Sequence, residues 1–186
     1  MSEKIVKFVD GKMISYTLYD LVDNTDKILS TVTEPFDFMS PPTEPTELAI
    51  SLTQTMNKHG GIGLAANQVG LPFRVFVMGL HGSYYACFNP EIVSTFGQVG
   101  AEEGCLSYPG LFLKVQRADR VTMKYQDASG TFKEETFTGL TAKIIQHEID
   151  HLNGKLWTDS VPRVSLMRAK EKVKINKKRA QRARVI

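Results

Sequence analysis

Two histidines four positions apart have the clearest chemical potential in this chain, in the segment His147-Glu148-Ile149-Asp150-His151. If the segment is helical, both imidazoles lie on one face of the helix and can bind a single metal ion. Glu148 then lies one position round the helix, where its carboxylate reaches a water molecule at the metal. This HExxH pattern predicts a hydrolytic metal site.

A catalytic site of this kind needs a third ligand, since three protein ligands and a water are the usual set. Where one protease pattern has a third histidine, the chain has Trp157, whose indole cannot ligate. Glu171 lies among lysines, where pairing of acid with base on a helix is the ordinary explanation. Cys105 is the better candidate, because a thiolate with two imidazoles suits Zn²⁺ or Fe²⁺ and leaves one position open.

Three segments together resemble the signature motifs of the peptide deformylases. They are GIGLAANQVG at 61–70, EGCLS at 103–107 and QHEIDHLNG at 146–154, in the order typical of that family. The resemblance covers about residues 27–162. It implies a metal-dependent hydrolase that removes the formyl group from the N-terminal methionine of nascent polypeptides and releases formate.

The resemblance also implies a role for each matching residue. The ligands of one divalent metal ion would be Cys105, His147 and His151, with Fe²⁺ expected and Zn²⁺ or another divalent ion as an alternative. Glu148 is similar to the family's general acid and base. The side-chain amide of Gln68 and the backbone N–H of Leu106 correspond to the groups that hold the formyl oxygen.

A methionine pocket is expected beside the metal. Its expected lining is Ile62, Gly63, Leu140, Lys143 and Ile144. Lys143 is a departure, because family members usually have an apolar residue four positions before the first histidine. We expect its aliphatic stem to line the pocket wall and its ammonium group to reach the rim.

Several elements must position these groups. Apolar residues at a spacing of four predict a helix over 46–58, which ends at a glycine pair and leads into the glycine-rich loop. Apolar runs at 73–78 and 84–88 predict buried strands, the second ending before Asn89-Pro90. Alternation over 121–125 and a turn after it predict a hairpin with 131–137.

Apolar positions at helical spacing also predict a helix over 140–152, with Gly154 as its stop. We therefore expect an α+β fold, with antiparallel or mixed sheets around a central helix that carries the HExxH pattern. A length of 186 residues fits a single domain. We divide the chain into an N-terminal β extension (1–26, with a hairpin turn at Asp10-Gly11), a catalytic core (27–162) and a basic tail (163–186).

Charge is distributed unevenly along the chain. Residues 163–186 contain ten Lys or Arg and one Glu, a net charge of +9, whereas residues 1–162 have 13 basic and 19 acidic residues, a net charge of −6. We expect a basic C-terminal helix that turns Leu166, Met167 and Val173 toward the body. Such a tail is suited to polyphosphate, so contact with the ribosome or its RNA is expected, and a merely solvated helix is the alternative.

Composition excludes several other classes of protein. With 42% hydrophobic and 23% charged residues the chain should fold, and no stretch approaches the roughly 18 apolar residues of a membrane span. The N-terminal segment has no apolar run of a secretion signal, and two cysteines make no disulfide framework. We expect a cytoplasmic monomer, with an organelle or the cytoplasm of a virus-infected host as alternative locations.

Two other functions stay open at this level. An HExxH endopeptidase would cleave between residues and would release no formate. A non-catalytic, ribosome-binding module with a structural metal would need four protein ligands, and the sequence offers three good candidates.

Overall fold

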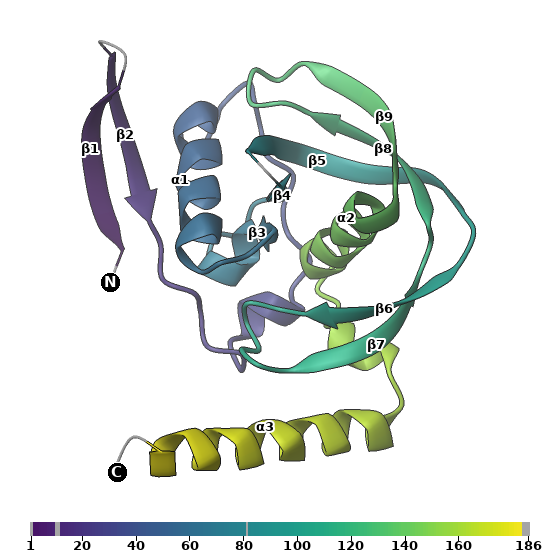
Figure 1. Ribbon diagram of the computed structural model, residues 1–186. Coiled ribbons are helices and arrows are strands. Elements are labelled where there is room, and N and C mark those ends of the chain that lie inside the picture. Colours follow the sequence, from purple (N-terminus) through teal and green to yellow (C-terminus); the bar gives the residue numbers. More distant parts are fainter. Residues whose placement is uncertain (1, 10–11, 81, 184–186) are drawn as a thin grey trace.

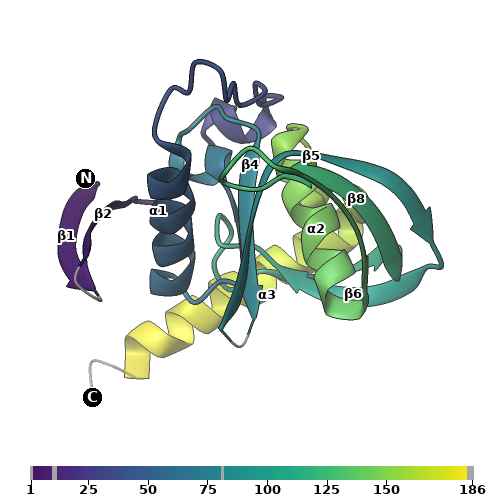
Figure 2. The same cartoon turned by 90° about the horizontal axis from the view of Figure 1, so that it is seen from above.

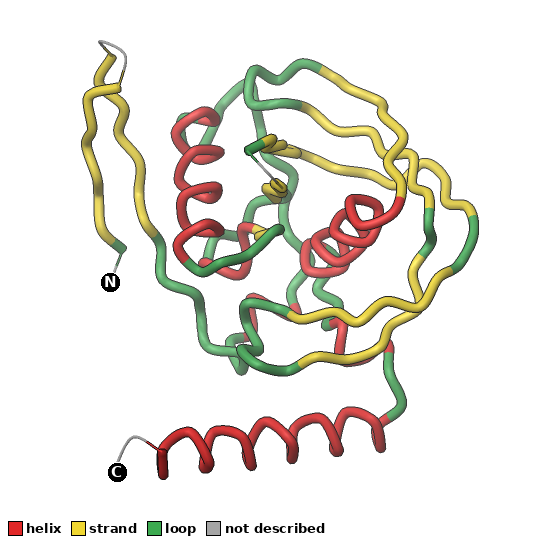
Figure 3. Tube along the Cα trace, viewed as in Figure 1, coloured by secondary structure: helices red, strands yellow, loops and turns green. Residues whose placement is uncertain are grey.

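The computed structural model describes residues 2–9, 12–80 and 82–183 (Figure 1). The strands are β1 (Glu3–Val9), β2 (Lys12–Leu18), β3 (Gly63–Ala65), β4 (Val75–Leu80), β5 (Ser83–Phe96), β6 (Val99–Gly104), β7 (Phe112–Arg117), β8 (Arg120–Gln126) and β9 (Phe132–Thr138). The α-helices are α1 (Pro45–Lys58), α2 (Gly139–Leu152) and α3 (Arg163–Ala183), and short 3-10 turns lie at Lys27–Ser30, Ala66–Val69 and Trp157–Ser160 (Figure 3).

The strands form three antiparallel sheets, in agreement with the α+β fold expected from the sequence. One sheet has the strand order β3-β4-β5-β8-β9, and β1–β2 and β6–β7 form separate pairs. In Figure 2 the five-stranded sheet lies between α1 and α2. In Figure 1, α3 runs along the outside of the molecule, next to β7.

Alternating side chains of β4 serve two hydrophobic clusters, one on each face of the large sheet. Val75 and Val77 pack with the buried residues of α1. Phe76 and Met78 pack with Ile145 and other buried residues of α2. Because side chains alternate along a strand, a strand that is covered on both faces is apolar throughout. That is why the sequence could identify this strand and both helices.

The second predicted strand does not end at Phe88, because β5 continues to Phe96. Asn89 adopts a left-handed conformation with φ of 50°, and the pairing register with β8 shifts between Phe88 and Glu91. The Asn89 side-chain amide donates hydrogen bonds to Phe36 O and to Gln126 Oε1. These hydrogen bonds stabilise a β-bulge at Asn89-Pro90, and the strand continues beyond it.

A third hydrophobic cluster joins the basic helix to the small β6–β7 sheet. It contains Trp157 and the buried face of β7, and Leu166, Ala169 and Val173 of α3 pack against it. The expected inward position of Met167 was wrong, because 62% of this side chain is exposed. The residues that pack lie three and four positions apart, so they define one narrow stripe along the helix.

The N-terminal residues form the hairpin β1–β2, which packs on α1. The backbone N–H of Thr17 donates to Ser51 Oγ at 2.9 Å, and that of Tyr19 donates to Thr55 Oγ1 at 3.1 Å. The hairpin turn expected at Asp10-Gly11 lies outside the described residues. Among the described residues, no helix combines the length and the apolar character that crossing a bilayer requires.

Candidate metal centre and active site

Helix α2 is held in place by one apolar face. Ile145, Ile149 and Leu152 are buried against the five-stranded sheet. Beyond the end of the helix, Gly154 has φ of 66°, and a Cβ there would lie 2.8 Å from the carbonyl carbon of Ser30. Glycine therefore lets the chain leave the helix against the Lys27–Ser30 turn.

Cys105, His147 and His151 lie together although more than forty residues separate the cysteine from the first histidine. One potential ligand atom from each residue lies within 4.8 Å of the others. Cys105 directly follows β6, and its Sγ is 3.2 Å from Nε2 of His151. Burial, followed by the positive charges of His147 and Arg117, lowers the pKa of His151 and favours the neutral imidazole that binds metals.

Glu148 lies beside this cluster as a buried carboxylate. Its side chain is 3% exposed, and its Oε2 has no hydrogen-bond partner among the described residues. Burial is the main cause that raises the pKa of Glu148 to about 7. An unpaired buried oxygen on a carboxyl group near neutral pKa is suited to a water or a substrate proton.

Gly63 leaves the space that this carboxylate occupies. A Cβ at position 63 would collide with Oε1 of Glu148 and would lie 2.9 Å from Cγ2 of Ile144. The glycine-rich loop can therefore approach α2 closely only because this position has no side chain.

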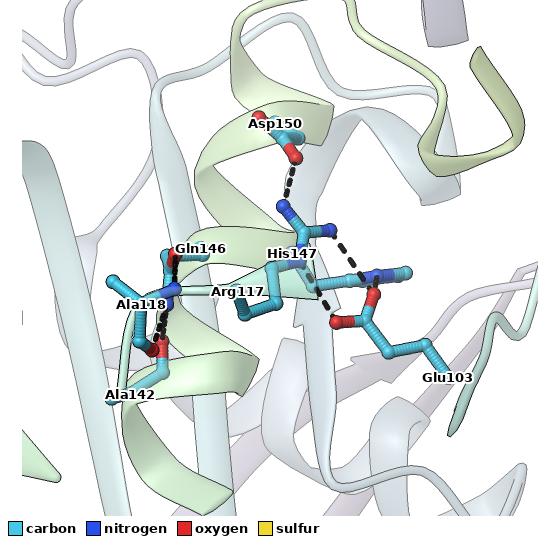
Figure 4. Close-up of polar contacts among 7 residues, drawn as sticks. All are labelled: Glu103, Arg117, Ala118, Ala142, Gln146, His147 and Asp150. Carbon is cyan, nitrogen blue, oxygen red and sulfur yellow. Dashed lines mark hydrogen bonds and ion pairs between the residues drawn. The ribbon is translucent and has the colours of Figure 1, made fainter. Parts of the chain in front are cut away.

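Glu103 orients the imidazole of His147. Its Oε2 lies 3.1 Å from Nδ1 of His147 (Figure 4). Burial alone would lower the pKa of His147, but the hydrogen bonds to Cys105 and Glu103 outweigh it and raise that pKa to about 10. A metal ion bound here would compete with this proton, and the carboxylate would hold the ring in one orientation for it.

Arg117 on β7 holds Glu103 in turn. Its Nε and Nη2 donate to the two Glu103 oxygens at 2.8 and 3.0 Å, and Nη1 donates to Asp150 (Figure 4). Burial alone would raise the pKa of Glu103, but the hydrogen bonds to His147 and Arg117 lower it to about 2. The sequence analysis missed this network. One feature of the sequence could have indicated it. Arg117 follows Leu113 and Val115 at a spacing of two, so it lies on the same buried face of β7.

Gln146 of α2 binds Ala118, the residue that directly follows β7. Its Nε2 donates to the carbonyl oxygens of Ala118 and Ala142, and its Oε1 accepts from the Ala118 N–H at 2.9 Å (Figure 4). The position of Arg117 relative to the helix is therefore fixed on both sides, by Gln146 and by Asp150.

Gln68 directs its amide toward Cys105, one of the three candidate metal ligands. Its Oε1 accepts from the Ala65 N–H at 2.9 Å, and its Nε2 donates to Ser107 Oγ at 3.1 Å. The same Nε2 lies 3.5 Å from Sγ of Cys105. Since Gln68 is almost fully buried and held at both ends, its amide is a preoriented donor at this site.

A cavity of about 860 Å³ opens onto this centre. Its wall includes all five residues expected in the substrate pocket, Ile62, Gly63, Leu140, Lys143 and Ile144. Gln68, Cys105 and Leu106 also line it, as do His147 and Glu148. The structure thus brings these candidate residues to one cavity, whereas His151 is buried and is not part of its lining.

The geometry agrees with comparisons to known proteins. The family model described as Polypeptide deformylase matches residues 18–166. A peptide deformylase of Rhodopseudomonas palustris is 39% identical over 166 residues, which are 83% of this chain and 94% of the relative.

Solved structures are similar over most of their length. A peptide deformylase of Legionella pneumophila has a TM-score of 0.79 at 35% identity, covering 89% of this chain and 98% of that one. A Met-Ala-Ser-bound peptide deformylase of Acinetobacter baumannii has a TM-score of 0.73 at 30% identity, covering 77% and 98%.

Proposed function

The chain belongs to the polypeptide deformylase family, whose activity is removal of the N-formyl group from nascent peptides, and we propose that Cys105, His147 and His151 bind its metal ion. The observation that carries this proposal is the convergence of one thiol and two imidazoles beside the unpaired carboxylate of Glu148, at the wall of one cavity. A structural metal would be enclosed by four protein ligands, so three ligands beside an open cavity favour catalysis.

The donor set fits the metal chemistry of this family. Peptide deformylases are metalloenzymes, and a soft thiolate with two imidazoles suits Fe²⁺, which we propose as the native ion, or Zn²⁺. When bound, such an ion supplies a Lewis acid that lowers the pKa of a water and polarises a carbonyl group.

Glu148 moves the protons of the reaction. It takes a proton from the water that attacks the formyl carbon and later gives it to the amine of the departing methionine. A pKa of about 7 suits both steps, because the group can accept and release a proton near neutral pH. Proton transfer by a positioned side chain contributes about 10²- to 10⁴-fold to the rate.

Gln68 and the backbone N–H of Leu106 stabilise the negative charge that develops on the formyl oxygen. The Gln68 amide is fixed by Ala65 and Ser107 before substrate arrives, so it needs no reorganisation during the reaction. One such preoriented donor is worth on the order of 3 kcal/mol in the transition state.

The cavity wall provides the methionine pocket. Ile62, Leu140 and Ile144 present apolar surface for a thioether side chain, and Gly63 leaves room for the substrate backbone. The Acinetobacter baumannii relative binds Met-Ala-Ser, which is the peptide that deformylation of formyl-Met-Ala-Ser would leave.

Formate release tests this function. The metal-loaded enzyme should release formate from formyl-Met-Ala-Ser, should stop when a chelator removes the metal, and should leave the internal bonds of an N-blocked longer peptide intact. Internal cleavage without formate would instead establish the endopeptidase.

We also propose that α3 contacts ribosomal RNA. The basic residues of α3 with described, exposed side chains are Arg163, Arg168, Lys170, Lys172, Lys174, Lys178 and Arg179. Because Leu166 and Val173 pack on the body, truncating the helix would disturb the fold as well as the charge. Replacing Lys170, Lys172 and Lys174 by glutamine is therefore the better test.

This triple variant should co-sediment less with ribosomes at low salt, because fewer phosphate counterions are released on binding. Its release of formate from a free tripeptide should stay unchanged. Unchanged co-sedimentation would leave α3 as a solvated helix. The cytoplasmic location, the monomeric state and the division of the chain at residues 27 and 162 stay predictions.

A further inference from the structure

Lys143 brings a positive charge to the wall of the substrate cavity. It lies on α2 four residues before His147, so it is on the same helical face one turn earlier, and its side chain is half-buried. Among the described residues that line the cavity, it is the only lysine or arginine. Within the same part of the chain, no carboxylate forms an ion pair with it.

The acidic residues of the cavity wall do not neutralise this charge. Glu103 is bound by Arg117 and His147, and Glu148 is buried against Gly63. Glu102 is exposed on β6. The side chain of formylmethionine is neutral, so a counter-charge in the complex would come from another part of the substrate.

We propose that Lys143 selects formylated peptides that carry a carboxylate side chain at their third residue. In an extended peptide, residues 1 and 3 project from the same face about 7 Å apart. One helical turn separates Lys143 from His147 by about 6 Å along α2, toward the half-exposed Leu140. Because Lys143 lies between Leu140 and Ile144, its aliphatic stem borders the methionine side chain, and its ammonium group can extend outward to the rim, within reach of the third side chain on the same face of the peptide.

The net charge of the body of the molecule is opposite to the charge of Lys143. Residues 1–162 have a net charge of −6, which would disfavour acidic peptides in general. A local ammonium group on a flexible stem can reverse that effect at one substrate position. Exposed ion pairs change binding by up to about fivefold, and we expect a three- to fivefold preference at this half-buried site. Because Lys143 touches no reacting atom, the preference should appear in KM and leave kcat alone.

The inference rests on the proposed function, and amidated tripeptides test the two separately. Formate release from formyl-Met-Ala-Ser-amide tests deformylation itself. The ratio of kcat/KM for formyl-Met-Ala-Glu-amide to that for formyl-Met-Ala-Gln-amide tests the selection. Lys143→Met removes the charge from the cavity, and Lys155→Met removes the same charge from an exposed site outside it.

The unmodified enzyme and Lys155→Met should prefer the Glu peptide three- to fivefold through KM, and 0.5 M salt should reduce the preference. In Lys143→Met the ratio should fall to one or below. A ratio of one in the unmodified enzyme, or a preference that survives in Lys143→Met, overturns the proposal. An equal preference for Glu at the second residue overturns the assignment to the third.

Discussion

Replacing Arg117 by methionine should damage both the fold and the metal site. The Arg117 side chain is 8% exposed, and its three hydrogen bonds go to Glu103 and Asp150. Methionine keeps most of the apolar stem and removes the charge. The variant leaves the carboxylate of Glu103, itself 9% exposed, without the guanidinium group that binds both of its oxygens.

The cost follows from this burial. Removing one partner of a buried ion pair costs about 3 to 5 kcal/mol, because the other charge stays out of water. Asp150 is less buried and can be solvated, so we expect the lower end, about 3 kcal/mol. Glu103 will then protonate or turn away from His147. Loss of such an orienting carboxylate weakens metal affinity about 10- to 100-fold.

Two measurements check this prediction. Urea unfolding can be followed by fluorescence, since Trp157 is the only tryptophan and is buried with its ring centroid 6.1 Å from that of His147. Metal affinity can be measured by competition with a chelator. The matched control is Lys124→Met, which removes an exposed pair with Glu134 and should cost less than about 1 kcal/mol.

The reasoning would be refuted by an Arg117→Met variant within 1 kcal/mol of the unmodified protein, or by one with unchanged metal affinity. A double variant tests whether the unpaired charge of Glu103 causes the loss of stability. Adding Glu103→Gln to Arg117→Met removes the stranded charge, so the double variant should be less destabilised than the sum of the two single changes.

Three further predictions test other parts of the site and the fold. Glu148→Ala should keep its metal in elemental analysis and release formate about 10²- to 10⁴-fold more slowly, and near-normal turnover would remove Glu148 from the mechanism. Cys105→Ser exchanges a soft ligand for a weak one, so its metal content should fall, and full occupancy would exclude Cys105 as a ligand. Leu166→Ala should lower the free energy of unfolding by about 1 kcal/mol in urea titration, whereas Met167→Ala, on the exposed face of α3, should change it by less than about 0.5 kcal/mol; equal effects would contradict the packing of α3.

Local sequence patterns predicted the helices and strands in which apolar residues recur at a regular spacing. Helix α2 and the buried strands have apolar residues at helical or strand spacing, so their type could be inferred without knowing what they pack against. The HExxH spacing likewise places two imidazoles on one face of α2. No period could bring Cys105 to them, and that inference depended on ligand chemistry together with the resemblance of three motifs to a family.

The missed features depend on long-range contacts. Strand β6 reads Val-Gly-Ala-Glu-Glu-Gly, and residues of this kind have low strand propensity, so only its pairing with β7 makes it a strand. Arg117 and Glu103 are fourteen residues apart, and nothing local marks them as partners. Asn89 likewise extends β5 through bonds to Phe36 and Gln126.

X-ray absorption spectroscopy of the metal-loaded enzyme tests the central claim most directly, because it counts the ligand types around the ion. We predict one metal per chain, with one sulfur and two imidazole nitrogens from the protein and the remaining coordination from light atoms of exchangeable ligands. A spectrum without sulfur, or one that requires a fourth protein ligand, would contradict the assignment of Cys105, His147 and His151 as an open catalytic site.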